Sequence, residues 1–597
     1  MNLKVQVKAI DLVTKLANGH LNQTAYINYE PQKKDYVYKK QRKPFPRSTP
    51  EKQGISSEYL QTFLEELGAE ESIHTQGIMI VRNGSVILEG AYKPYDLNMW
   101  RATHSLSKSL VGIATGIAIE EGYFQLEDTV ASIFNKTYLP ILGGRKKDIT
   151  IYNLLTMSSG IGFNEVGVLI DENWIEDFLD SQTHFEPGKD FQYNSMNTYM
   201  LSAIIQERSG QTLEEFLTER LFEPLGIDNV SWEKSPEKRT KGGWGLYITL
   251  EDRTKIGQLF LNEGMWEGKR IVSKEWLDLM TKKVKDTPPE MNLYGYGAHV
   301  WMGRRKDSFL FNGVLGQNTI VYPDMNMVIS IMSSDYEMFV NSRLMDIVDK
   351  YFSSSSFEPA ESLKENPHTY RKLQNYLAGM YFQKEFSWQE VKEEKKFGWS
   401  RFKMRKRNRF GEILSDLPED IDKISFSNYH VAENDIGIMP LFVQTFQNNF
   451  SQGITWFQFK KENGGLILSL QEHEIKLDIP IGFSQPKYSV LNFREEHYQV
   501  AVLGKLKMTE EDIPVLKLQI SFLETTNCRN LSFYFYKDHV WIKAKEIPDP
   551  NKVIDQLTPI IGFSLPAGGV ETIKNSDLVQ GKVIRMTEPE TKAFPLD

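Results

Sequence analysis

A run of small and aliphatic side chains, preceded by a short polar segment, constrains the fold of this chain most strongly. Residues 101–122 read RATHSLSKSLVGIATGIAIEEG. Apolar side chains occupy nearly every side of the helix that this pattern predicts, which indicates a central helix with little solvent contact. These side chains are Leu106, Leu110, Val111, Ile113, Ala114, Ile117 and Ala118. One domain must therefore be built around this helix.

Ser105 and Lys108 lie at the polar start of the predicted helix. Residues three apart share a face one turn above the other, so the Lys108 side chain can reach the Ser105 hydroxyl. A serine hydroxyl is a weak nucleophile until a base takes its proton, and a lysine can be that base when burial and nearby positive charge favour its neutral form. A buried helix N-terminus supplies both conditions. We predict a nucleophile and its base here, with an ordinary helix start as the alternative.

The S-x-x-K spacing alone is weak evidence, because it occurs five times in the chain. Context separates the pair at Ser105 from the others. The remaining pairs lie beside or across a proline, or within a basic run, and none begins an apolar helix. They are Ser231/Lys234, Ser235/Lys238, Ser400/Lys403 and Ser484/Lys487.

Length and composition limit the class of protein. A chain of 597 residues should hold two or three domains. Its net charge of -9 gives no reason to expect nucleic acid as a partner. The single cysteine, Cys528, excludes an intrachain disulfide and a Cys-rich zinc site. The ten histidines are scattered, so we expect neither a metal nor an organic cofactor.

No segment of the sequence predicts export or membrane insertion. The first 20 residues are interrupted by charges and lack the apolar core of a secretory signal. The longest apolar run, Leu110 to Ile119, is too short to cross a bilayer. We therefore expect a cytoplasmic protein that acts on a small molecule, while the oligomeric state stays open.

The hydropathy pattern predicts four regions. Residues 1–48 are polar and basic toward their end, and we expect a loosely attached lead-in. Residues 49–352 combine strands at both ends with helices between them, which predicts a sheet assembled from distant parts of the chain with a helical insertion. Residues 353–364 have the composition of a linker. Residues 365–597 change to a period of two, which predicts an all-β sandwich or barrel.

Several elements of the second region can be placed individually. Asn83-Gly84 between two apolar runs is a strong hairpin signal. One helix is predicted with Leu60, Phe63, Leu64 and Leu67 on one face, and a second begins at Tyr199 and ends at Gly210. An amphipathic helix is predicted from Leu250 to Leu261. Two more helices are predicted, one near Trp276 and one from Val340 to Phe352. Phe191 to Tyr193 is expected to be extended, and three successive strands are expected between residues 294 and 334.

The basic run at residues 395–410 mixes aromatic residues with eight cationic ones. Such a run can bind an anionic polymer, but a solvated loop between strands is the favoured interpretation.

Three motifs occur in the order found in the serine β-lactamase and penicillin-binding protein superfamily. They are Ser105-Leu106-Ser107-Lys108, Tyr193-Asn194-Ser195 and the strand that contains Phe311-Asn312-Gly313. The connecting segments ITIYNLLTMSSGI, GGWGLYITLEDRTKIGQLFLNEG and LYGYGAHVW are also similar to that family. The region from about Thr49 to Phe352 resembles its class C branch, which includes esterases and 6-aminohexanoate-dimer hydrolases. The resemblance implies an α/β (α+β) β-lactamase/transpeptidase-like domain, an antiparallel sheet flanked by helices.

The resemblance also implies roles for particular residues. Ser105 would form an acyl-enzyme with Lys108 as the base, and Tyr193 would relay protons to the leaving group; a buried structural tyrosine is the alternative for Tyr193. The backbone N–H groups of Ser105 and Val314 would form the oxyanion hole. Gly313 would belong to the substrate-binding residues, together with Ser195, Asn197 and Asn312.

Two positions depart from the family pattern. The asparagine of the family's Y-x-N motif is replaced by Ser195, and whether Asn197 supplies the missing amide contact stays open. Asn312 stands where the K-T-G or H-x-G motif carries a cation that helps to hold a substrate carboxylate. The loss of this cation points away from penicillins and D-Ala-D-Ala peptides.

These features predict a serine hydrolase that cleaves an ester or amide through an acyl-enzyme. The alternatives are a catalytically silent module that uses the same cleft to hold a ligand, and a β-lactamase or DD-peptidase. The C-terminal β domain resembles domains appended to some of these hydrolases, and its sequence carries no chemical motif.

Overall fold

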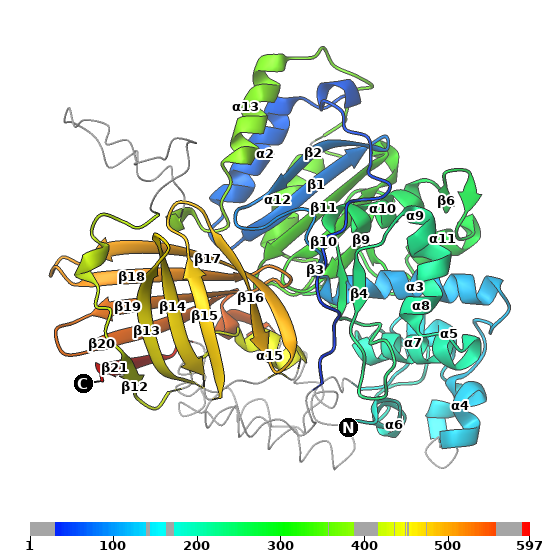
Figure 1. Ribbon diagram of the computed structural model, residues 1–597. Coiled ribbons are helices and arrows are strands. Elements are labelled where there is room, and N and C mark those ends of the chain that lie inside the picture. The colour runs from blue at the N-terminus through cyan, green and yellow to red at the C-terminus, as the bar shows by residue number, and fades with distance from the viewer. Residues whose placement is uncertain are drawn as a thin grey trace. The chain divides into compact units, whose positions relative to one another are not determined.

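The computed structural model describes two compact units of the chain (Figure 1). The described residues are 30–138, 144–162, 172–355, 357–386, 416–434, 436–447, 449, 453–472, 474–553, 555–556 and 588–596. The first unit contains Pro31–Gly379 and a segment that begins at Lys552, and the second is formed mainly by Met380–Asn551 and residues 588–596. The chain passes from one unit to the other after Gly379, and the boundaries at residues 48, 352 and 364 stay a prediction.

A six-stranded antiparallel sheet forms the centre of the first unit, in the order β2-β1-β11-β10-β9-β8. Asn83 and Gly84 join the first two strands with positive φ angles of 49° and 70°, as the hairpin signal predicts. Strand β1 of this first hairpin pairs with β11, from His74 with Ser334 to Arg82 with Met327, which confirms a sheet assembled from distant segments. The strands are β1 (His74–Arg82), β2 (Ser85–Ala91), β8 (Trp301–Met302), β9 (Phe309–Gly313), β10 (Gln317–Tyr322) and β11 (Met327–Ser334).

Three helices pack together at one side of this sheet (Figure 1). They are α2 (Ser57–Ala69), α12 (Arg343–Phe352) and α13 (Pro367–Ala378). The predicted apolar face of α2 is buried at all four positions. Helix α12 begins three residues later than predicted because the Ser342 side chain caps it by accepting from the Met345 N–H.

The predicted helical insertion lies between β2 and β8. Its central helix is α3, which packs against α7, α8 and α11 (Figure 1). Every residue of α3 from Ser107 to Ala118 is buried, which confirms the central position predicted from its apolar pattern. The helices are α3 (Ser107–Glu120), α4 (Val130–Tyr138), α5 (Ile151–Leu155), α6 (Trp174–Asp180), α7 (Ser195–Ser209), α8 (Leu213–Leu217), α9 (Glu223–Leu225), α10 (Leu250–Leu261) and α11 (Lys274–Thr281).

Helix α10 has the predicted bounds but differs from the predicted amphipathic pattern. It packs on β1, β10 and β11, and its polar residues are buried together with its apolar ones. Lys255 and Asp252 form a fully buried ion pair with a separation of 2.9 Å, and Arg253 donates to the Asn318 carbonyl oxygen. Buried charges require partners of this kind. The expectation of an amphipathic helix is wrong because the polar side of α10 is also buried: Asp252 and Lys255 pair within the helix, and Arg253 finds its acceptor on β10.

The described part of the predicted lead-in is attached to the first unit. Phe45 is buried, and backbone hydrogen bonds join Pro46 and Ser48 to Val86 of β2. The expectation of a loose attachment is therefore wrong for this part, because Phe45 fills an apolar space beside the sheet. Two short sheets complete the unit: β3 (Arg101–Ala102) with β4 (Val230–Trp232) and β5 (Leu246–Ile248), and β6 (Met265–Trp266) with β7 (Lys269–Arg270).

The second unit is a ten-stranded antiparallel sheet in the order β15-β14-β13-β12-β21-β20-β19-β18-β17-β16. Gly504 of β17 donates to the carbonyl oxygen of Gly482, just after β15, so the two ends of the sheet meet and nearly close it into a barrel. Its interior is filled by alternating apolar residues. This unit confirms the predicted all-β sandwich or barrel, and the basic run at 395–410 lies outside the described residues.

The elements of the second unit are β12 (Tyr429–Val431), α15 (Leu441–Gln447), β13 (Ile454–Glu462), β14 (Gly465–Glu472), β15 (Ile475–Ile481), β16 (Lys487–Phe493), β17 (Glu496–Met508), β18 (Pro514–Phe522), β19 (Cys528–Phe535), β20 (Val540–Ile547) and β21 (Glu590–Pro595). Within the described ranges of both units, the helices are too short or too polar to cross a membrane.

Candidate active site

Ser105 lies in a 3-10 turn, η3 (His104–Leu106), that leads directly into α3. Thr103, just before this turn, donates through its N–H and its hydroxyl to the Leu246 carbonyl oxygen of β5. His104 has a φ of 49°, a left-handed conformation that reverses the chain between strand and helix. Ser105 is therefore held at the N-terminal end of a buried helix, where free N–H groups carry partial positive charge.

Lys108 lies one turn further along and points back to Ser105. Its Nζ atom donates to Ser105 Oγ over 2.8 Å and to the Gly243 carbonyl oxygen over 2.9 Å. Lys108 is only 2% exposed, whereas Ser105 is partly exposed. Of the five S-x-x-K pairs, the one predicted from its helical context therefore brings its lysine into contact with its serine.

Two consecutive glycines provide backbone acceptors for this helix start. The Gly242 carbonyl oxygen accepts from Ser107 Oγ over 2.7 Å, and that of Gly243 accepts from Lys108. Gly242 has a φ of 68°, and a Cβ atom on Gly243 would lie 2.8 Å from the Ser195 carbonyl oxygen. Both positions therefore require glycine. Sequence reasoning gave them no role, although the Gly-Gly doublet is a visible signal of close backbone approach.

Tyr193 is brought to the same place by the turn before α7. The Lys108 Nζ atom lies 4.9 Å from the centre of the Tyr193 ring, within the range of a cation–π contact. The ring stacks on Trp301 with a centroid distance of 5.5 Å. Helix α7 begins at Ser195, four residues earlier than predicted, because the Asn194 side chain caps it by accepting from the Met196 N–H.

Ser195 and Asn197 lie in the first turn of α7. Ser195 lies close to Gly243, because a Cβ atom on Gly243 would be 2.8 Å from the Ser195 carbonyl oxygen. The Asn197 amide accepts from Ser159 Oγ over 2.7 Å and contacts Met157 Sδ at 3.6 Å, and the residue is 1% exposed. The known contacts of Asn197 are thus internal, and its predicted substrate contact stays a prediction.

The end of β9 approaches the turn that carries Ser105. A Cβ atom on Gly313 would lie 2.1 Å from the Thr103 carbonyl oxygen and 3.1 Å from the Leu106 nitrogen, so no other residue fits here. Val314, predicted for the oxyanion hole, directly follows this glycine in the sequence, and its role stays a prediction. Asn312 Nδ2 donates to Asn318 Oδ1 over 2.8 Å, so the two residues form an uncharged amide pair across β9 and β10.

Two histidines adjoin the site without carrying charge near neutral pH: the partly buried His104 and the fully buried His299. Burial lowers the pKa of His104 to about 4; Glu233 opposes this shift and Lys108 adds to it. Burial lowers the pKa of His299 to about 3, again with a contribution from Lys108. His299 Nε2 lies 3.0 Å from the Thr198 hydroxyl oxygen, and its backbone carbonyl oxygen accepts from Ser109 of α3.

A buried ion pair, Lys241 with Glu233, adjoins the Gly242-Gly243 segment. Lys241 Nζ lies 2.7 Å from Glu233 Oε2, and both side chains are less than 5% exposed. Tyr247 Oη donates to the other carboxylate oxygen of Glu233 over 2.9 Å. Backbone hydrogen bonds from the Lys241 N–H to the Glu233 carbonyl oxygen and from the Glu233 N–H to the Gly245 carbonyl oxygen close this loop. Sequence reasoning did not identify this pair.

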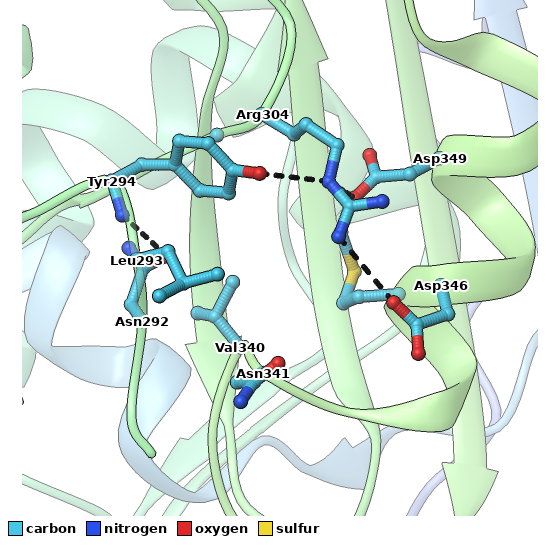
Figure 2. A pocket seen from close by; sticks show the side chains of 10 residues that line it. Asn292, Leu293, Tyr294, Arg304, Val340, Asn341, Asp346 and Asp349 are labelled. Atoms are coloured by element: carbon cyan, nitrogen blue, oxygen red, sulfur yellow. Dashed lines mark hydrogen bonds and ion pairs between the residues drawn. The ribbon is translucent and has the colours of Figure 1, made fainter. Parts of the chain in front are cut away.

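Two cavities of the first unit lie away from these residues. One of about 20 Å³ surrounds Arg304, which lies between the Tyr294 hydroxyl and the carboxylates of Asp346 and Asp349 (Figure 2). Burial raises the pKa of Asp349 to about 6. The volume is sufficient for about one water molecule.

The other cavity, of about 600 Å³, is lined by residues 42–46 and the Asn83-Gly84 turn among others. Two of its three charged residues, Lys43 and Glu267, pair with each other at 2.6 Å. Across the described ranges, no cluster of three or more His, Cys, Asp or Glu side chains is arranged to hold a metal ion.

Ser105, Lys108 and Tyr193 all lie in a part of the chain that matches a known family. Residues 60–349 match the family model described as Beta-lactamase, and this part of the chain belongs to that family. The predicted resemblance is thereby confirmed for residues 60–349.

Two curated relatives share part of this region. Protein flp of Staphylococcus aureus (strain NCTC 8325 / PS 47) is 28% identical over 201 residues, which cover 31% of this chain and 40% of that protein. The putative penicillin-binding protein PbpX of Bacillus subtilis (strain 168) is 28% identical over 278 residues, which cover 41% of this chain and 65% of that protein. The chain thus spans less than two thirds of the length of either relative.

Among solved structures, a putative 6-aminohexanoate-dimer hydrolase from Bacillus anthracis is similar with a TM-score of 0.44 and 18% identity. The similarity covers 61% of this chain and 95% of that one. A likeness at this level carries no argument about substrate.

Proposed function

We propose that this protein is a serine hydrolase that cleaves an ester or amide bond through an acyl-enzyme on Ser105. The observation that carries the proposal is the 2.8 Å contact between Lys108 Nζ and Ser105 Oγ at the start of a buried helix. Membership of residues 60–349 in the β-lactamase family supports it.

Acylation would begin with attack of Ser105 Oγ on the substrate carbonyl carbon. Lys108 in its neutral form takes the hydroxyl proton, because its Nζ atom is already within hydrogen-bond distance. The charge that develops on the carbonyl oxygen is stabilised by the backbone N–H groups of Ser105 and Val314. The carbonyl oxygen of Gly243 keeps the Lys108 side chain in place throughout.

Collapse of the tetrahedral intermediate would break the bond to the alcohol or amine. Tyr193, beside Lys108, delivers the proton that the leaving group needs, and Lys108 replenishes it. Water then attacks the acyl-enzyme by the reverse route, which returns the proton to Ser105 and releases the acid. The reaction uses no cofactor, and we propose that it takes place in the cytoplasm.

The amide pair of Asn312 and Asn318 favours esters or amides without a carboxylate over β-lactams and D-Ala-D-Ala peptides. A charge-assisted hydrogen bond to such a carboxylate is stronger than the neutral one that an asparagine can donate. Ser195, Asn197 and Gly313 would complete the substrate contacts around this position.

The test is intact-mass spectrometry of the full chain after treatment with an activated fluorophosphonate. We expect one adduct, which peptide mapping places on Ser105 and which Ser105→Ala abolishes. Ser107→Ala is the matched control, because Ser107 lies in the same turn but its hydroxyl is occupied by the Gly242 carbonyl oxygen. An unlabelled wild-type chain would favour the alternative, a silent module that only holds a ligand.

A further inference from the structure

Four aromatic rings form a continuous group beside the proposed nucleophile, here called the aromatic platform: Phe191, Tyr193, Trp301 and Phe339. Trp301 stacks on Tyr193 and lies 6.2 Å from Phe191 between ring centroids. Phe339 meets the Tyr193 ring edge-on at 5.7 Å. The platform begins next to Lys108, whose Nζ atom is 4.9 Å from the Tyr193 ring. A group bound there would be adjacent to the Ser105 hydroxyl.

The platform is assembled from three separate segments. Phe191 and Tyr193 are two residues apart in the segment before α7, Trp301 belongs to β8, and Phe339 follows β11. Both residues of the first segment contact the same Trp301 ring. Tyr296 packs edge-on against Trp301 at 4.8 Å and supports it from another side. The positions of the rings are therefore fixed by packing.

Exposure differs along the platform. Trp301 is 3% exposed and Tyr193 is 9% exposed, whereas Phe191 and Phe339 are only half-buried. Burial of apolar ring surface is favourable, so a ligand that covers the accessible part of Phe191 and Phe339 gains binding free energy. The two outer rings thus offer apolar surface that a bound group can cover.

The mechanism proposed above decides which part of a substrate reaches this surface. Tyr193 delivers a proton to the leaving group, so the leaving group lies on the Tyr193 side of the scissile bond. The rings next to Tyr193 therefore flank the leaving group and not the acyl group. Aromatic rings bind flat apolar groups by offset stacking or edge-to-face contact.

We propose that the aromatic platform binds the leaving group and selects neutral aromatic alcohols or amines, with Phe339 and Phe191 as specificity-determining residues. The inference rests on the proposed function. In the favoured reaction the bond from Ser105 Oγ to the acyl carbon forms and the bond from that carbon to the aromatic leaving group breaks. The leaving oxygen or nitrogen takes the proton that Ser105 gave up, and water later regenerates the serine.

The experiment compares kcat/KM for three acetate esters: benzyl, n-butyl and 4-carboxybenzyl acetate. All three form the same acetyl-enzyme, so differences in kcat/KM report the step in which the leaving group is bound and expelled. For the wild type we expect kcat/KM for benzyl acetate to be about tenfold higher than for n-butyl acetate. We expect kcat/KM for 4-carboxybenzyl acetate to be lower than for benzyl acetate. Phe339→Ala should lower the benzyl-to-butyl ratio by about two- to tenfold, the range of one aromatic contact, mainly through KM.

Phe357→Ala is the matched control. Phe357 is also a half-buried ring of the first unit, stacked on Tyr59 at 4.9 Å, in a cluster near α2 and α12. Its loss should leave the ratio unchanged, while Phe339→Tyr should retain it. If Phe339→Ala does not fold, Phe339→Leu removes the ring but keeps apolar volume, and Phe191→Ala tests the other end of the platform.

The outcomes separate this inference from the proposed function. Fluorophosphonate labelling of Ser105 with a benzyl-to-butyl ratio near one overturns the platform but leaves the hydrolase intact. An equal fall of both rates in Phe339→Ala, with the ratio unchanged, also overturns it, because that pattern indicates a structural role. Absence of labelling contradicts the proposed function and the inference together.

Discussion

Lys108 Nζ and Ser105 Oγ lie 2.8 Å apart although the two residues belong to different kinds of turn, a 3-10 turn and the first turn of α3. The second contact of Lys108, with the Gly243 carbonyl oxygen, fixes the side chain independently of Ser105. The proposed nucleophile and its base are thus in position before any substrate binds, which avoids the cost of ordering them in the transition state.

Removal of either member of this pair should abolish acylation while the fold is retained. We expect Ser105→Ala and Lys108→Ala each to lower turnover of p-nitrophenyl acetate by several orders of magnitude. The double variant should be no worse than the singles, because residues that act as a unit are not additive. Near-normal turnover in Lys108→Ala would show that another group is the base.

Replacement of Asn312 by lysine should shift selectivity toward β-lactams. A hydrogen bond from a charged group contributes roughly 1.5–3 kcal/mol, which is about one to two decades in kcat/KM. The expected gain is smaller, because the present amide pair already offers a neutral donor. The measurement is the ratio of nitrocefin to p-nitrophenyl acetate hydrolysis in Asn312→Lys and wild type. An efficient wild-type β-lactamase, or an unchanged ratio, would contradict a charge filter at this position.

His299 should make the first unit less stable in acid. Burial lowers its pKa in the folded state to about 3, whereas an unfolded histidine titrates near 6.5. Between these pH values the unfolded chain binds more protons, so the free energy of unfolding falls as the pH is lowered, by up to about 1.4 kcal/mol per pH unit. The effect is absent above about pH 6.5.

His299→Asn tests this dependence, because asparagine tolerates the positive φ of 59° at this position. Hydrogen-exchange protection of α3, corrected for intrinsic rates, should fall less between pH 7 and pH 5 in the variant than in the wild type. His104, whose pKa is lowered to about 4, is present in both proteins and therefore contributes equally to the pH dependence of their stability. The exposed His368 provides the control substitution His368→Asn, and equal pH dependence in all three proteins would contradict the prediction.

Removal of one charge from the buried ion pair of Glu233 and Lys241 should destabilise the protein strongly, whereas replacement of both charges should destabilise it little. Lys241→Met leaves a buried carboxylate without its cation, which typically costs about 3–5 kcal/mol. The double variant Glu233→Gln/Lys241→Met should recover most of that loss in urea unfolding. Because the pair supports the Gly242-Gly243 backbone, the single variant should also slow ester turnover. Additive losses in the double variant would show that the two charges are not coupled.

The solubility and stability of a truncated chain should depend on whether the chain retains α13. In α13, Leu373 and Leu377 are buried and the Tyr376 hydroxyl donates to the Leu64 carbonyl oxygen of α2. We therefore expect a chain that ends at Gly379 to be soluble and labelled at Ser105, and a chain that ends at residue 357 to be aggregated or much less stable. Insolubility of both chains would show that the first unit requires the residues after 379.

Much of the fold followed from local sequence patterns. The Asn83-Gly84 hairpin, the buried face of α2 and the bounds of α10 are set by turn chemistry and by the spacing of apolar residues within one element. The same reasoning separated the S-x-x-K pair at Ser105 from four others, because only that pair begins an apolar helix. Such patterns act over a few residues, so a single sequence is sufficient to read them.

The tertiary structure decided what surrounds Ser105. The carbonyl oxygen of Gly243, the ring of Trp301 and the ring of Phe339 come from segments between 138 and 234 residues further along the chain. Nothing in their immediate neighbours in sequence indicates which side chain they meet. Helix and strand formation depend on local hydrogen bonding and periodicity, but these contacts depend on how completed elements pack against one another. The pair that we propose to be catalytic was therefore determined by the sequence, and the surroundings that hold it were determined by packing alone.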